Sequence, residues 1–154
     1  MTLAAAATED CSREAFSQVV GETSAALTAM NESQKQGFQA KLSALKQRKG
    51  WTDADYVAKA ASYVRDDRIA ALDVKIQSLL AKIPELGASA PALAGATPPA
   101  KDMAPAHCDM LAKLRGVMAE VIENNRAKWV YMTEKLDGAL EERARRKPPD
   151  DRAC

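Results

Sequence analysis

Histidine is nearly absent from this 154-residue chain, and its scarcity restricts the chemistry that the protein can perform. The one histidine, His107, is preceded neither by the Cys-x-x-Cys of covalent haem attachment nor by the Glu-x-x of a di-metal carboxylate helix. It is adjacent to Cys108, so on a helix the two side chains diverge by about 100° and form no nucleophile–base pair. These absences argue against an enzyme, and we expect no cofactor.

Aromatic residues, an excess of one charge and long apolar runs are also missing. Aromatics are 5% of the chain and alanine is common, a combination that favours helix over sheet. The formal net charge of +1 provides no field that would attract nucleic acid. No run approaches the roughly 20 apolar residues that cross a bilayer. We therefore expect an all-α protein with no nucleic-acid partner and no transmembrane segment.

Apolar residues recur at helical spacing over three long stretches of the chain, and they predict three helices. We expect the helices at about residues 12–49, 52–83 and 105–147. Because only Gly50 and Trp51 connect the first two, these helices must form an antiparallel hairpin. The predicted fold is an up-down-up bundle of three long helices.

Local signals mark the ends of these helices. Gly50 supplies a left-handed stop for the first helix, and Pro84 is expected to end the second. Thr52, followed three residues later by Asp55, is a favoured N-cap for the second helix. The apolar stripe of the second helix is expected to comprise Val57, Ala61, Val64, Leu72, Ile76, Leu79 and Ile83.

A linker rich in proline and alanine, residues 84–106, precedes the third helix. Its prolines restrict the chain before it meets a partner, which lowers the entropy lost on docking. Leu86, Leu93 and Met103 are its larger apolar side chains, and we predict that they bind a partner. The alternative is a solvated connector without a binding role.

Cys11 and Cys108 stand at the starts of the first and third predicted helices, and we expect them to form a disulfide. Geometry alone also allows a third helix antiparallel to the first, because an extended linker is long enough to span the length of the bundle. The disulfide selects the up-down-up arrangement, in which both cysteines lie at the same end. Cys154 is then a free thiol or an intermolecular link.

The domain organisation and the location of the protein follow from the two chain ends and the cysteines. Residues 1–8 are expected to be a disordered N-terminus or the remnant of a signal peptide, since their small residues allow Ala-x-Ala cleavage. Residues 9–147 form the helical bundle domain, and residues 148–154 a polar tail. Disulfides are typical of exported proteins, so a periplasmic or secreted location is predicted. The alternative is a cytosolic protein with unpaired thiols.

Two function classes remain open. The first is a non-catalytic exported protein that binds a protein partner as an accessory protein, subunit or chaperone-like module, with homodimerisation as a further option. The second is a carrier of a small ligand or metal, using the bundle core or the end that holds Met103, His107 and Met110. Thioether and imidazole are ligands that select Cu(I), but a disulfide-bonded Cys108 is no thiolate ligand.

Polar residues interrupt the apolar stripes, at Gln34, Asp67, Arg68 and Asn125. Such residues in a helical bundle fix the register of the helices. They also suit the lining of a small-molecule cavity. We favour the first interpretation, and the second stays open.

Overall fold

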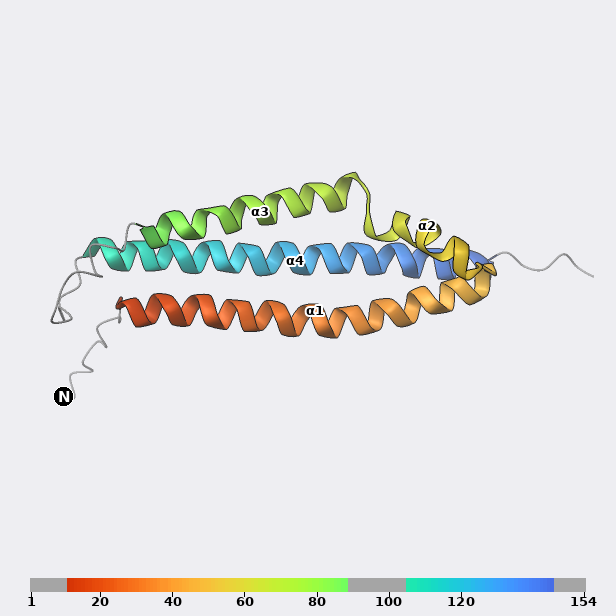
Figure 1. Cartoon of the computed structure of the whole chain (residues 1–154), viewed down its shortest axis with the longest axis horizontal. Coiled ribbons are helices and arrows are strands. Elements are labelled where there is room, and N and C mark those ends of the chain that lie inside the picture. The colour runs from red at the N-terminus through yellow and green to blue at the C-terminus, as the bar shows by residue number, and fades with distance from the viewer. Residues whose placement is uncertain (1–10, 89–104, 146–154) are drawn as a thin grey trace, which may run out of the picture. The chain divides into compact units, whose positions relative to one another are not determined.

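The computed structural model consists of four helices (Figure 1), and it describes the backbone of residues 11–88 and 105–145 and the side chains of residues 11–86 and 107–142. The helices are α1 (Arg13–Lys49), α2 (Asp53–Val64), α3 (Asp67–Ala88) and α4 (Pro105–Arg145). These ranges contain no strand, which confirms the all-α class. No helix within them combines the length and the apolar character that a membrane span requires.

The contacts divide the chain into two compact units. Unit 1 comprises Met1–Leu27 and Ile76–Glu123, and unit 2 comprises Thr28–Lys75 and Asn124–Cys154. The predicted segment 1–8 and the predicted tail 148–154 lie outside the described residues.

Both ends of α1 follow local backbone chemistry. The Ser12 hydroxyl accepts a hydrogen bond from the Ala15 N–H at 3.2 Å, so Ser12 caps the helix start. At the other end Gly50 has a φ of +63°, in the left-handed region that glycine adopts without steric cost. The Trp51 N–H then donates to the Lys46 carbonyl at 3.1 Å. The predicted stop at Gly50 is confirmed.

The start of α2 was also correctly predicted. Thr52 has an extended backbone, and its side chain accepts a hydrogen bond from the Asp55 N–H at 3.2 Å. The Thr52 hydroxyl in turn donates to the Asp55 carboxylate at 2.9 Å. Asp55 therefore bonds to the capping hydroxyl twice, through its backbone N–H as donor and through its carboxylate as acceptor.

The single helix predicted over residues 52–83 is wrong, because the structure has α2 and α3 in its place. The chain is extended at Arg65, with φ −141° and ψ 112°. Asp66 then caps α3, since its Oδ1 accepts from the Ile69 N–H at 2.8 Å. An aspartate that caps a new helix competes with continuation of the old one.

The break between α2 and α3 changes which residues are buried. Val57, part of the predicted stripe, is 76% exposed, and Ala60 is buried in its place. Tyr56 and Tyr63 lie four residues before and three residues after Ala60, and both pack against the same core cluster. The predicted stripe therefore fails in α2, where Val57 and Val64 are exposed. It holds in α3, where Leu79 is buried and Leu72, Ile76 and Ile83 are half-buried.

Asp66 is held by α4 as well as by the α3 backbone. Its Oδ2 accepts from the Lys135 ammonium at 2.7 Å and from the Tyr131 hydroxyl at 2.8 Å. The hydrogen bond from Lys135 holds the pKa of Asp66 well below its usual range, and the Ile69 N–H lowers it further. The hydrogen bond to Asp66 raises the pKa of Tyr131. These contacts join the α2–α3 break to α4 in unit 2.

The pH dependence of folding provides a test of this role. Because the pKa of Asp66 is lower in the folded chain than in the unfolded chain, its carboxylate stabilises the fold above about pH 4, and this stabilisation is lost as the pH falls further. Asp66→Asn is therefore expected to melt below wild type at neutral pH, with a difference that shrinks below about pH 4. Thermal melts followed by circular dichroism between neutral and acidic pH measure both effects.

The neighbouring Asp67→Asn is the matched control for that experiment, since Asp67 is exposed and forms no ion pair with the rest of the described chain. It is expected to leave the acid dependence unchanged. A melting difference between Asp66→Asn and wild type that stays constant down to the lowest pH would contradict the role of the Asp66 carboxylate.

The predicted helix end at Pro84 is also wrong, because α3 continues through Pro84 to Ala88. A proline inside a helix removes one hydrogen bond and costs about 3 kcal/mol. Pro84 itself is exposed. Ile83 and Leu86 on either side pack against the core of unit 1, and this burial offsets the cost. Of the predicted linker 84–106, residues 84–88 belong to α3 and residues 105–106 to α4, and residues 89–104 lie outside the described residues.

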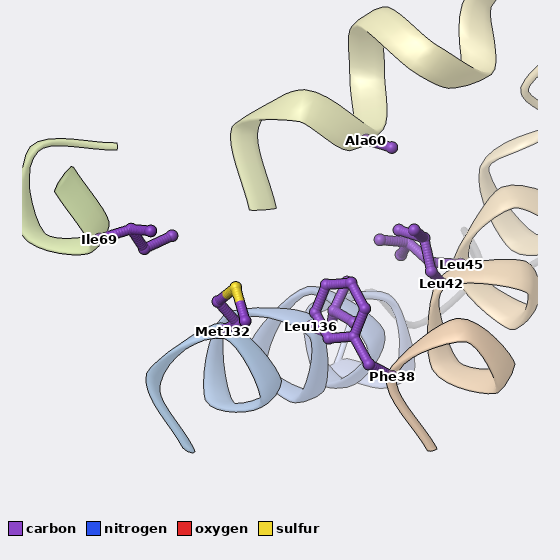
Figure 2. Close-up of a cluster of buried hydrophobic side chains, with 7 residues drawn as sticks. All are labelled: Phe38, Leu42, Leu45, Ala60, Ile69, Met132 and Leu136. Carbon is purple, nitrogen blue, oxygen red and sulfur yellow. The ribbon is translucent and has the colours of Figure 1, made fainter. Parts of the chain in front are cut away.

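The core of unit 2 is a cluster of seven buried side chains from all four helices (Figure 2). Leu136 is completely buried and Leu45 is 1% exposed. Trp129 packs against the same cluster, with its ring edge-to-face on Phe38 at a centroid distance of 5.9 Å. The members of the cluster are Phe38, Leu42, Leu45, Ala60, Ile69, Met132 and Leu136.

Candidate functional site

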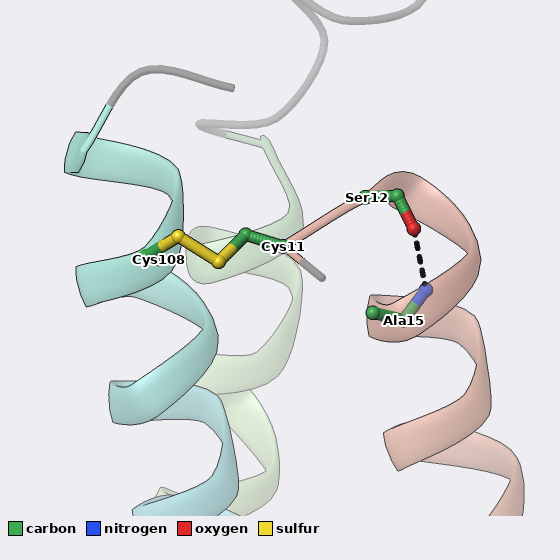
Figure 3. Close-up of a disulfide and its surroundings, with 4 residues drawn as sticks. All are labelled: Cys11, Ser12, Ala15 and Cys108. Atoms are coloured by element: carbon green, nitrogen blue, oxygen red, sulfur yellow. Dashed lines mark hydrogen bonds between the residues drawn. A yellow bond between two sulfur atoms is a disulfide. The ribbon is translucent and has the colours of Figure 1, made fainter. Parts of the chain in front are cut away.

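The predicted disulfide between Cys11 and Cys108 is present in unit 1 (Figure 3). The two Cα atoms lie 5.0 Å apart, and the bond closes a sequence separation of 97 residues. Cys11 lies two residues before α1 and is 2% exposed, while Cys108 lies in the first turn of α4. The disulfide therefore holds the starts of α1 and α4 at one end of this unit.

The disulfide is part of the core of unit 1. Phe16 from α1 packs with three residues of α4, and Ile83 and Leu86 reach this cluster from the end of α3. Three helices thus meet beside the disulfide. The buried members of the cluster are Cys11, Phe16, Leu111, Leu114 and Met118.

An apolar groove of about 370 Å³ opens beside this cluster. Its volume is in the range of about 300 to 1,000 Å³ that ligand sites in proteins occupy. One wall is α1, another is α3, and α4 contributes one buried leucine. The lining residues are Phe16, Ser17, Val20, Gly21, Ile83 and Leu114.

The shape of the groove depends on two features of α1. Val20 is 39% exposed although it lies one turn after the buried Phe16, so it offers apolar surface to a ligand. Gly21 leaves open space, because a methyl group added there would meet no heavy atom within 4 Å. Ser17, one turn before Gly21, is also small. A ligand can therefore approach the α1 backbone closely at this point.

The groove has no ionisable side chain among its lining residues. The Ser17 hydroxyl is its one polar side-chain group, and Ser17 has no histidine or carboxylate beside it in the lining. Such a surface offers no general acid, no general base and no metal ligand of the usual types. It can bind an apolar ligand surface through burial of area.

The predicted partner-binding residues are only partly described. Leu86 lies in α3, not in a linker, and packs half-buried against the cluster beside the disulfide. Its contact with the core gives it a structural role that the sequence interpretation did not foresee. Leu93 and Met103 lie outside the described residues. Binding of a partner by these three residues stays a prediction.

The alternative metal end is also only partly described, because Met103 lies outside the described residues. Met110 packs half-buried against the core of unit 1. His107 has a buried Nδ1 without a hydrogen-bond partner among the described residues, and Cys108 is committed to the disulfide. Within residues 11–86 and 107–142, no three His, Cys, Asp or Glu side chains gather in a way that could hold a metal.

Sequence reasoning did not identify the groove. Val20 and Ile83 have the spacing of core residues, and nothing local to them shows that α1 and α3 leave space between them. The available signal was the pair Ser17 and Gly21, two small residues one turn apart on the flank of an apolar stripe. Comparison of the chain with protein-family models, with curated proteins and with solved structures finds no match.

Proposed function

We propose that this protein is a non-catalytic, exported helical protein that acts through protein–protein interaction, as an accessory protein, subunit or chaperone-like module. The observation that carries the proposal is the open apolar groove between α1 and α3 in unit 1. An apolar, uncharged surface suits binding and offers no means of catalysis. Export is supported by the disulfide, because such bonds persist in oxidising compartments.

The proposed occupant is an amphipathic helix of a protein partner. A helix that lies in a groove presents side chains at positions i, i+3, i+4 and i+7, and these side chains need apolar walls without charge. The lining meets that requirement, and the open space at Gly21 accommodates the closest approach of the two helices. The partner helix is therefore expected to carry aliphatic residues on one face.

The architecture proposed with this function is the up-down-up bundle, in which α2 and α3 together take the place of one returning helix. The disulfide supports this arrangement because it joins Cys11, two residues before α1, to Cys108 at the start of α4. A docked partner helix would then add a fourth helix alongside α1 and α3.

Photo-crosslinking in the native host tests the proposal. Benzoylphenylalanine replaces Val20 in the groove, or Val74, a 65% exposed valine of unit 2, as the matched control. We expect crosslinks to a protein partner from position 20 and none from position 74. Mass spectrometry of the adduct should place the crosslinked peptide in an amphipathic helix, and a synthetic peptide of that sequence should compete.

A second variant separates binding from folding. Gly21→Trp fills the groove and should abolish the crosslink from position 20 with an unchanged melting temperature, since the added side chain enters open space. Gly116→Trp, at an exposed glycine of α4 with open space around it and outside the groove lining, should leave the crosslink intact. Equal crosslinks from positions 20 and 74, or none from either, would overturn the proposal. An adduct of twice the chain mass would assign the groove to a second copy.

A further inference from the structure

Unit 2 contains a second depression, which differs from the groove because polar side chains line it. Its volume is about 480 Å³, and it lies between α1 and α4. The α1 residues recur at positions i, i+3, i+4 and i+7, and the α4 residues at i, i+3 and i+4, so each helix contributes one face. The lining residues are Thr28, Asn31, Glu32, Lys35, Asn125, Lys128 and Trp129.

Hydrogen bonds between the two helices give this depression a defined geometry. The Asn31 side-chain carbonyl accepts from the Asn125 amide at 2.9 Å and from the Trp129 indole N–H at 2.8 Å. The indole ring is fixed further by its edge-to-face contact with Phe38. Trp129 is thus held as a rigid wall of the depression.

Asn125 supplies a side-chain carbonyl to the depression. The residue is 7% exposed, and its amide nitrogen is used by Asn31 and by the Met30 sulfur, 3.4 Å away. Its side-chain carbonyl accepts no hydrogen bond from the described residues, although Asn125 lines the depression. This carbonyl is not among the buried polar atoms that lack a partner in the described chain, so a donor from a ligand or from water can reach it.

Charged side chains of both signs border the depression. Lys128 donates to Asp73 at 2.7 Å, which uses one of its three N–H groups. Glu32 and Lys35 form no ion pair with any part of the described chain. One unpaired anion and one unpaired cation therefore border the same space. A simple anion in the depression would be repelled by Glu32, and a simple cation would be repelled by Lys35.

We propose that this depression binds a small zwitterion of the α-amino-acid type. Its carboxylate lies at Lys35 and Lys128, its ammonium at Glu32 and the Asn125 carbonyl, and its side chain against Trp129. This binding site is separate from the groove of unit 1 and shares no lining residue with it. The protein thereby gains a ligand-binding function beside the interaction proposed above.

Tryptophan fluorescence of the full chain tests the proposal directly. The chain has two tryptophans, so Trp51→Phe leaves Trp129 as the only reporter. The probes are L-phenylalanine and L-glutamine. Two analogues of L-phenylalanine each lack one charge: N-acetyl-L-phenylalanine has no ammonium, and L-phenylalaninamide has no carboxylate. We expect a saturable change in Trp129 emission with at least one zwitterion, and binding of its single-charge analogues weaker by about tenfold.

Variants in the same Trp51→Phe chain assign the two charges. Lys35→Met and Glu32→Gln should each weaken binding of the zwitterion by about tenfold. Lys59→Met removes a half-exposed lysine of α2 that pairs with Asp55 outside the depression, and it should have no effect. No saturation with either zwitterion, equal binding of the analogues, or equal weakening by Lys59→Met would overturn the proposal. None of these results bears on the groove, which is probed separately by the crosslinks from position 20.

Discussion

Replacing both Cys11 and Cys108 with alanine is expected to lower the free energy of unfolding by about 4 to 5 kcal/mol. The disulfide closes a long loop, with a sequence separation of 97 residues. In the loop-entropy model such a crosslink restricts the unfolded ensemble strongly. The loss is a large fraction of the 5 to 15 kcal/mol by which domains are typically stable. Guanidinium unfolding under non-reducing conditions, followed by circular dichroism, measures it.

Two controls belong to this experiment. Cys154→Ala should leave stability unchanged if the third cysteine pairs with neither of the other two. Wild-type protein treated with a reductant should approach the stability of the double variant. A loss below about 1 kcal/mol in the double variant would mean that the crosslink restrains little of the unfolded chain.

Leu136→Ala is expected to destabilise the protein by about 2 to 5 kcal/mol. Leu136 is completely buried in the core of unit 2, in the same cluster as Phe38 and Leu42 (Figure 2). Truncation removes buried methyl groups and leaves a cavity that the surrounding helices fill only in part. Urea unfolding should show a lower midpoint with an unchanged slope.

Val130→Ala is the matched control for Leu136→Ala, because it truncates another aliphatic residue of α4 in the same unit. Val130 is 50% exposed, so its loss should change stability by no more than about 0.5 kcal/mol. Equal effects of the two variants would show that Leu136 does not lie in a cooperative core.

The features of this protein that could be predicted from sequence are those decided by neighbouring residues. Thr52 and Gly50 delimit helices because the capping hydroxyl and the left-handed turn act within a few residues. The pairing of Cys11 with Cys108 was predicted from their places at the starts of two predicted helices, although helix lengths alone also allowed a third helix antiparallel to the first.

The break at Asp66 was missed because its partners lie far away in the chain. Tyr131 and Lys135 are 65 and 69 residues distant, and their hydrogen bonds stabilise the carboxylate that caps α3. A pattern of apolar residues along one stretch contains no information about such partners. The N-capping preference of aspartate was visible locally, but it does not by itself outweigh helix continuation.

For the two candidate sites as well, some features were predictable from sequence and others required the tertiary structure. Sequence by itself determined that the chain is helical, that the two cysteines lie at helix starts, and that Asn125 interrupts an apolar stripe, because these depend on composition and spacing. Only the tertiary structure decided that Val20 borders a groove and that Asn31 accepts hydrogen bonds from both Asn125 and Trp129 beside a polar depression. The reason is physical: whether a residue on a helix face is buried, or borders an opening, depends on how closely the facing helices approach, and that distance is set by side chains remote in the sequence.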